Sequence, residues 1–202
     1  MNDEKSPLFP DEVRRLISEH RIFSGGRRHR ELVGELLPEG AVWIDIVVPL
    51  SDVYAQYRLY DEPVLVFASG DPLFFGFTTT LMREFEGRVT RTFPSFSSLQ
   101  MLAHALRLPY HDMRVVSLTG RPWHEFDRAL IERAHKVGVL TDRKNTPATI
   151  AKRMLDYGYT AYRMYVGVRL GGEREETYSL PLEEVVTRDF PHPNCLIIEA
   201  VE

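Results

Sequence analysis

Apolar residues follow helical and strand-like spacing by turns along the first half of the chain. Residues 10–20 place Val13, Leu16 and Ile17 on one face of a helix, and the run 64–68 has the apolar, partly β-branched composition of a buried strand. Strands that alternate with helices predict a parallel sheet with helices on both of its faces. The predicted helices are 10–20, 28–37, 51–58, 74–86 and 97–108, and the predicted strands are 21–26, 41–50, 64–68 and 88–93.

The pattern breaks at Pro109-Tyr110-His111-Asp112, where we expect a domain boundary. The segment 176–186 and the last strand have the spacing of a hairpin or meander, which predicts a mixed second sheet. The sequence therefore predicts an α/β protein of two domains, 1–110 with a parallel sheet and 111–202 with a mixed sheet. The predicted elements of the second domain are strands 113–118, 137–141, 161–168 and 194–202 and helices 123–136 and 146–157.

Composition narrows the class of protein. The chain has 202 residues, 44% of them hydrophobic and 27% charged, which is typical of a globular protein. A net charge of −4 argues against general nucleic-acid binding, which needs a basic surface. No apolar run approaches the roughly 18–20 residues that span a bilayer. A single cysteine, Cys195, allows no internal disulfide and favours a cytoplasmic location. Neither a membrane nor a nucleic acid is expected as a partner.

A tight polar turn follows the strand 64–68, in the stretch "VLVFASGDPLFFG". In an open parallel sheet, ligands bind at the carboxyl ends of the strands, and this turn lies at such an end. Gly70 can adopt a positive φ or let a ligand approach closely. Pro72 is expected at the first position of the next helix. Asp71 could cap that helix or accept a hydrogen bond from a ligand, and both interpretations stay open.

Two further strand-to-helix junctions carry polar side chains. Ser97 and Ser98 begin a predicted helix, where they could cap it or bind a carboxylate group. Asp142, Asn145 and Thr146 follow the predicted strand 137–141, with Thr146-Pro147 as a helix cap and first position. This second group has more donors and acceptors than a cap needs, which favours a role in ligand binding.

A basic cluster follows two glycines at the start of the helix 28–37. Arg27, Arg28, His29 and Arg30 suit carboxylate or phosphate groups, although a solvated charged face is the alternative. The sequence has no phosphate-binding GxxxxGK[ST] loop, no GxGxxG fingerprint and no GxSxG nucleophile elbow. Its seven histidines show no HExxH pairing, so no protein-bound metal is expected.

Taken together, these junctions resemble those of the precorrin and cobalt-precorrin C5-methyltransferases of cobalamin biosynthesis. That family is the amino-terminal half of fused precorrin-6Y C5,15-methyltransferases and is part of the tetrapyrrole methylases. The resemblance covers residues 8–200. The matching motifs, in order, are "GGRRH", "ASGDPLFFG", "PSFSSLQ", "VVSLTGR", "TDRKNTPATIA", "VGVRLGG" and "PNCLIIE".

The resemblance implies an enzyme that transfers a methyl group from S-adenosylmethionine to carbon 5 of a precorrin-7-type corrin precursor, with or without cobalt. It implies a cofactor cleft between two domains, a homodimer and a tetrapyrrole substrate whose carboxylates meet the basic cluster. No catalytic base is identified. The positions that match cofactor-binding segments are Gly70, Asp71, Leu73, Ser97, Ser98, Asp142, Asn145, Thr146 and Pro147, followed by Arg169 and Leu170. The expected substrate-binding residues are Arg27, Arg28, His29 and Phe75.

Two departures from the family pattern give further expectations. Family members begin with one more strand before the "SPLFP" segment, so the first strand is expected to be missing here. Fused relatives continue into a decarboxylating methyltransferase domain, which would be a fused or associated partner. The alternatives are a methylase of another tetrapyrrole position, a methylase of a different substrate, and a non-catalytic tetrapyrrole-binding module.

Overall fold

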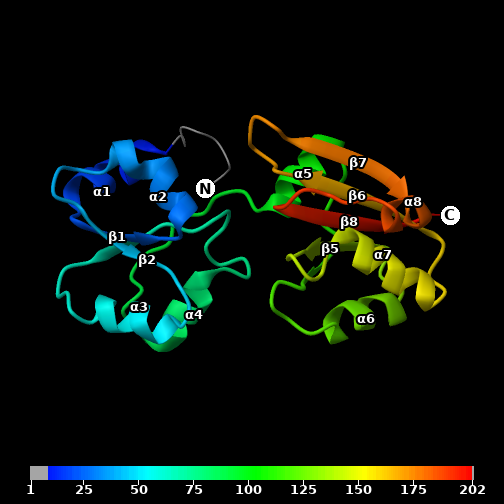
Figure 1. The fold of residues 1–202 in the computed structure, drawn as a ribbon, viewed down its shortest axis with the longest axis horizontal. Coiled ribbons are helices and arrows are strands. Elements are labelled where there is room, and N and C mark those ends of the chain that lie inside the picture. Colours follow the sequence, from blue (N-terminus) through cyan, green and yellow to red (C-terminus); the bar gives the residue numbers. More distant parts are fainter. Residues whose placement is uncertain (1–8, 202) are drawn as a thin grey trace. The chain divides into compact units, whose positions relative to one another are not determined.

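The computed structural model describes residues 9–201, and their contacts divide the chain into two compact units, Met1–Phe96 and Ser97–Glu202 (Figure 1). This division lies one helix earlier in the chain than the boundary expected near 109–112. The helix that follows Phe96 packs in the second unit. The expected absence of a first strand concerns the chain before Phe9 and lies outside the described residues. Within the described part, no helix has the length and apolar character needed to cross a bilayer.

The first unit has a three-stranded parallel sheet in the order β2-β1-β3. Ile22 of the central strand is paired with Val42 on one side and with Val64 on the other. The parallel sheet predicted for the first half of the chain is therefore confirmed. The elements are α1 (Asp11–Glu19), β1 (Ile22–Gly25), α2 (Arg27–Val33), the 3₁₀ turn η1 (Gly34–Leu36), β2 (Val42–Asp45), α3 (Leu50–Tyr57), β3 (Val64–Val66) and α4 (Phe77–Glu84).

Successive side chains of this sheet point to opposite faces, and each face has its own apolar core. Ile22 and Ile44 pack with residues of α3 and α4. Phe23 packs on the other face with residues of α1 and α2. Helices therefore cover both faces of the sheet, as the alternation of elements predicts.

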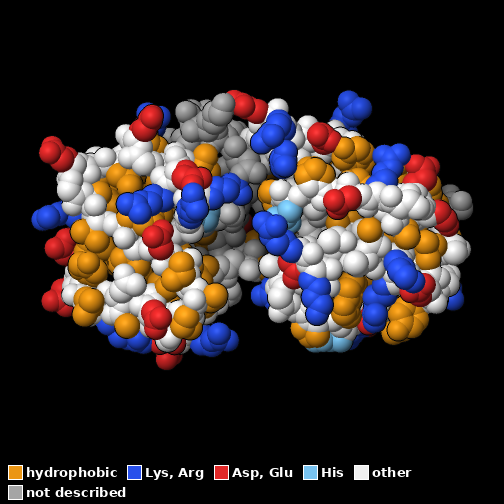
Figure 2. Space-filling view, in the orientation of Figure 1, with side chains coloured by type: hydrophobic (Ala, Val, Ile, Leu, Met, Phe, Trp, Pro, Cys, Tyr) orange, Lys and Arg blue, Asp and Glu red, His pale blue; other side chains and the backbone are white. Residues whose placement is uncertain are grey.

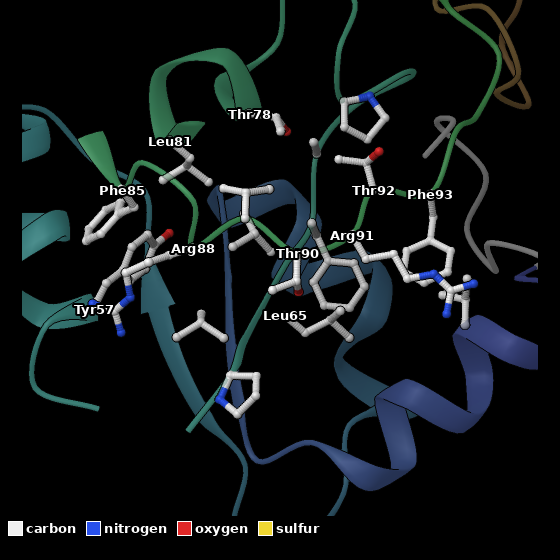
Figure 3. Close-up of a pocket in the computed structure, with 18 of the residues that line it drawn as sticks. Tyr57, Leu65, Thr78, Leu81, Phe85, Arg88, Thr90, Arg91, Thr92 and Phe93 are labelled. Carbon is white, nitrogen blue, oxygen red and sulfur yellow. The ribbon is translucent and has the colours of Figure 1, made fainter. Parts of the chain in front are cut away.

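The prediction of a strand at 88–93 is wrong. The described chain forms a turn there and then an irregular segment, and β3 is the last strand of its sheet. Leu65 of β3 and Thr90, Arg91 and Phe93 line a cavity of about 730 Å³. Figure 3 shows these side chains around it. A strand exists only when its backbone groups are paired with a neighbour. In the described part of the chain, the segment 88–93 has no strand to pair with, because the cavity separates it from β3.

The second unit has a five-stranded sheet in the order β4-β5-β8-β6-β7. β4 and β5 are parallel, whereas the other neighbouring strands are antiparallel, so the predicted mixed sheet is confirmed. The elements are α5 (Ser98–Leu106), β4 (Arg114–Ser117), α6 (His124–Ile131), β5 (Lys136–Leu140), α7 (Pro147–Asp156), β6 (Tyr162–Val168), β7 (Glu176–Pro181), α8 (Leu182–Val186) and β8 (Asn194–Ala200).

Two glycines explain why α5 belongs to this unit. The helices α6, α7 and α8 cover one face of the sheet with a continuous apolar core, and α5 packs on β5, β6, β7 and β8. A Cβ atom at Gly138 would lie 2.9 Å from Leu99 Cδ1, and one at Gly167 would lie 3.0 Å from Leu102 Cδ1. Both leucines are fully buried. The missing side chains in β5 and β6 therefore make room for the apolar face of α5.

We predict that Gly138→Val lowers the free energy of unfolding by about 1–3 kcal/mol, because the new side chain collides with Leu99 and with Met113 Sδ, 2.7 Å from the added Cβ. Urea unfolding would measure this change. Gly34→Ala is the control, since its Cβ would meet nothing within 4 Å and its φ is −52°. Valine favours strands, so any loss of stability comes from the collision and not from strand propensity. A Gly138→Val protein more stable than the unchanged chain would contradict the packing of α5.

Candidate functional site

The carboxyl ends of β1 and β3 meet at one edge of the first sheet, because the two strands are parallel neighbours. Gly25 and Gly26 end β1 and lead into α2. A Cβ atom at Gly25 would lie 3.0 Å from both His29 Cβ and Trp43 Cζ2, so only glycine lets these side chains lie against the end of the strand. The glycine pair therefore places the first turn of α2 beside the turn that follows β3.

His29 joins the two strand ends. Its Nε2 atom lies 2.9 Å from Ser69 Oγ, and the backbone N–H of Gly26 donates to its Nδ1 atom at 3.1 Å. Burial of the ring, together with the positive charge of Arg28, lowers the pKa of His29 to about 4. The imidazole is therefore neutral at neutral pH. Sequence analysis identified His29 as a ligand candidate but missed Ser69, which stands immediately before the Gly70-Asp71 turn.

The turn after β3 differs from the one that the sequence predicts. α4 begins at Phe77 with Gly76 as its N-cap, so Pro72 is not at its first position and Asp71 does not cap it. Instead, the Leu73 N–H donates to Asp71 Oδ1 at 2.9 Å, which closes a local turn. Polar side chains that bond to nearby backbone compete with the helix, and here the helix starts later.

Two residues with positive φ shape the same turn, Gly70 at 60° and Phe75 at 55°. Glycine adopts this conformation without strain, whereas Phe75 is held in it and its ring stays 40% exposed, edge-on to Phe74. Leu73 is 50% exposed. The turn thus presents two apolar side chains to solvent beside the carboxyl end of β3.

The arginines of the basic cluster differ in how far they are buried. Arg27 is 92% exposed and pairs with the Glu31 carboxylate, 3.1 Å away on the same helix. Partial burial lowers the pKa of Arg28 below its usual value. Basic and acidic side chains are interspersed on the face drawn in Figure 2, with several basic ones over the region where Figure 1 places α2.

In the second unit, Asp142 and Asn145 hold two loops together. The Asp142 carboxylate accepts backbone N–H groups of Gly120 at 2.9 Å, Lys144 at 2.8 Å and Asn145 at 2.6 Å. The Asn145 amide donates to the carbonyl oxygen of Leu118 at 2.8 Å and is almost fully buried. Burial opposes ionisation of Asp142, but the backbone hydrogen bonds outweigh it and lower its pKa. These side chains fix the loop after β4 against the loop after β5.

The other predicted cofactor positions of this unit also bond to the protein itself. Ser97 accepts the Gln100 N–H at 3.2 Å and Thr146 accepts the Thr149 N–H at 3.3 Å, so both act as N-caps, with Pro147 at the first position of α7. Ser98 bonds to Cys195 in β8, although burial still raises the pKa of that thiol to about 12. The polar side chains at these junctions are therefore used to shape the loops.

The fold brings these positions to one edge of the second sheet. Cys195 is paired with Leu140 and Gly167, so the ends of β5 and β6 meet the start of β8. The Arg169 N–H donates to Pro193 O at 2.9 Å. Thr141 and Asn194, which sequence analysis missed, are joined by a hydrogen bond of 2.7 Å. Their signal in the sequence is a polar residue at the boundary of an apolar strand, with Thr141 directly after β5 and Asn194 at the start of β8.

Comparison with known proteins identifies the family. The family described as Tetrapyrrole (Corrin/Porphyrin) Methylases matches residues 9–186. A Sinorhizobium precorrin-6Y C(5,15)-methyltransferase (decarboxylating) is 35% identical over 82% of this chain, which spans only 40% of that relative's length. A Salmonella typhimurium cobalt-precorrin-7 C(5)-methyltransferase is 32% identical over 80% of this chain and 78% of its own length.

A solved structure shares the fold. The uroporphyrin-III C-methyltransferase of Thermus thermophilus, complexed with S-adenosyl homocysteine, superposes with a TM-score of 0.68 at 22% identity, covering 95% of this chain and 86% of the other. The α/β fold with one parallel and one mixed sheet is therefore that of known methyltransferases. The matched residues 9–186, which include every predicted site residue, show that this chain belongs to the tetrapyrrole methylase family.

Proposed function

We propose that this chain is an S-adenosylmethionine-dependent methyltransferase that methylates carbon 5 of a precorrin-7-type corrin precursor in cobalamin biosynthesis. The observation that carries the proposal is the similarity of about four fifths of the chain to two relatives that are both named as C5 methyltransferases. The decarboxylating reaction in the name of the Sinorhizobium relative is left out, because this chain spans 40% of that protein.

The loops at the edge of the second sheet fit a cofactor. Asp142, Asn145 and Thr146 hold their backbone in place, and a Cβ atom added to Gly120 would meet nothing within 4 Å, which leaves open space beside the loop. When bound, S-adenosylmethionine supplies a methyl group that its sulfonium already activates. The residues that would hold it are the predicted positions Gly70, Asp71, Leu73, Ser97, Ser98, Asp142, Asn145, Thr146 and Pro147.

The protein's own task in such a reaction is to position its ligands and to exclude water, and no nucleophilic side chain is needed. Preformed loops serve this task, because loops that are already hydrogen-bonded lose little conformational freedom when a ligand binds. Arg27 and Arg28 would meet the carboxylates of the tetrapyrrole, with Phe75 beside its flat ring. A homodimer and an associated decarboxylating methyltransferase domain are part of the same proposal.

The purified chain is expected to add one methyl group to cobalt-precorrin-7 at carbon 5. NMR of the product made with ¹³C-methyl S-adenosylmethionine would locate the label, and calorimetry would measure cofactor binding. A label on another carbon would favour a methylase of a different tetrapyrrole position. Binding of the tetrapyrrole without turnover would favour the non-catalytic module.

Asp142→Asn is expected to weaken S-adenosylmethionine binding about tenfold and to lower the free energy of unfolding by about 1–3 kcal/mol. An amide can keep the two bonds at Oδ1 but loses the Gly120 N–H bond at Oδ2. Calorimetry and urea unfolding would measure the two effects. Lys152→Ala, which removes an exposed pair with Asp156 on α7, is the control. Unchanged cofactor affinity in Asp142→Asn would contradict a role for this loop.

Because the pKa of Asp142 is lowered, the difference in stability between Asp142→Asn and the unchanged chain should depend on pH. Because the folded pKa lies below the unfolded value of about 3.9, this carboxylate contributes stability that is present at neutral pH. That contribution is lost as the pH falls through the folded pKa. The stability of Asp142→Asn should therefore fall less steeply below about pH 4 than that of the unchanged chain.

Arg27→Ala and Arg28→Ala are each expected to weaken tetrapyrrole binding about tenfold and to leave cofactor affinity almost unchanged. The exposed Arg27–Glu31 pair contributes little to stability, so its guanidinium can turn to a ligand at small cost. Titration with both ligands would separate the effects. Arg15→Ala is the matched control, since Arg15 has the same i,i+4 glutamate partner, Glu19, on α1. Equal losses for both ligands would refute the assignment of the arginines to the substrate.

A further inference from the structure

Hydrogen bonds around His29 determine which of its nitrogens carries the proton. The Gly26 N–H points at Nδ1 from 3.1 Å and must donate, so Nδ1 is the unprotonated acceptor. A neutral imidazole then carries its proton on Nε2. The ring is neutral at neutral pH, because burial and Arg28 lower its pKa to about 4. His29 is therefore held in the Nε2–H tautomer by the backbone of its own helix.

This tautomer determines what Ser69 can do. The Nε2–H group donates to Ser69 Oγ at 2.9 Å, so the serine oxygen is the acceptor in this bond. A hydroxyl has one proton to donate, and it cannot be given to His29 as well. Among the described residues, His29 is the hydrogen-bond partner of the Ser69 side chain, which is exposed to solvent. The hydroxyl proton is therefore available to an acceptor from outside the protein.

The surroundings indicate the kind of acceptor. Ser69 follows β3 at the edge where parallel strands present their carboxyl ends, the usual place of a ligand in such sheets. Arg28 adjoins His29 in the chain and adds a positive charge near this edge, whereas the Asp71 carboxylate already accepts the Leu73 N–H. A hydroxyl donor in a region of positive charge suits an anionic oxygen, and a carboxylate is the form that a corrin precursor offers.

We infer that Ser69 donates a hydrogen bond to a carboxylate of the tetrapyrrole, and that His29 is a positioning residue that orients this hydroxyl. The inference rests on the proposed function and deepens it, because it moves the substrate contact from the histidine, where the sequence places it, to the serine. Both ring nitrogens of His29 are already used in hydrogen bonds within the protein.

Two substitutions of His29 separate positioning from a structural role. In His29→Asn, the side-chain oxygen can replace Nδ1 as acceptor for Gly26, but nothing reaches Ser69. In His29→Gln, the longer amide can replace Nε2 as donor to Ser69, but Gly26 loses its acceptor. The measurements are KM and kcat with cobalt-precorrin-7, the affinity for S-adenosyl homocysteine, and the ¹⁵N chemical shifts of the His29 ring. Ser18→Ala, an exposed serine of α1, is the matched control for Ser69→Ala.

We expect Ser69→Ala and His29→Asn each to raise KM about tenfold with little change in kcat, because the lost bond is made to the bound substrate throughout the reaction. The double variant should be no worse than either single one, since both remove the same interaction. His29→Gln should restore a KM close to that of the unchanged chain. Affinity for S-adenosyl homocysteine should stay constant throughout, and the ¹⁵N shifts should show protonated Nε2 and unprotonated Nδ1.

Three results would overturn the inference: unchanged KM in Ser69→Ala, a normal KM in His29→Asn with a raised one in His29→Gln, or ¹⁵N shifts of the Nδ1–H tautomer. The second is the pattern of a purely structural histidine. Absence of turnover of cobalt-precorrin-7 by the unchanged chain would instead refute the proposed function, and the inference with it. Failure of the inference alone is thus recognised by normal turnover in the unchanged chain.

Discussion

Backbone pairing between parallel strands is the constraint on which both candidate sites depend. β1 and β3 are paired so that Ser24 lies opposite Val66, and their chains therefore leave the sheet at the same edge. That coincidence brings His29 within 2.9 Å of Ser69, forty residues later. In the second unit, Ser117 lies opposite Leu140, so the loops that follow can be joined by Asp142 and Asn145. A shift of register in either sheet would separate these partners.

Polar side chains at the strand ends mainly form hydrogen bonds to the protein's own backbone. Asp142 accepts three backbone N–H groups, Asn145 is buried against Leu118 O, and Ser97 and Thr146 cap helices. A loop whose polar groups are satisfied internally keeps its shape before a ligand arrives. The groups left for a ligand are then backbone atoms, exposed apolar side chains such as Phe75, and the Ser69 hydroxyl, which His29 orients.

Much of this architecture follows from sequence patterns, with particular exceptions. The alternation of strands and helices predicts the parallel first sheet, and the meander-like end of the chain predicts the mixed second one, because both patterns are local. The strand expected at 88–93 is absent because a strand also needs a partner, which no local pattern records. Asp71 likewise fails as a cap, since its bond to the Leu73 N–H competes with a helix start at that point.

The sequence by itself determined most of the order of elements, the caps at Ser97 and Thr146, and the motifs that mark a tetrapyrrole methylase, because these depend on residues close together in the chain. Only the tertiary structure decided that α5 packs on the glycines of β5 and β6, that Asp142 bonds to Gly120, and that His29 bonds to Ser69. Each of these contacts joins residues that are between 22 and 65 positions apart in the chain. Strand register brings them together, and hydrogen-bond geometry then decides which atom donates.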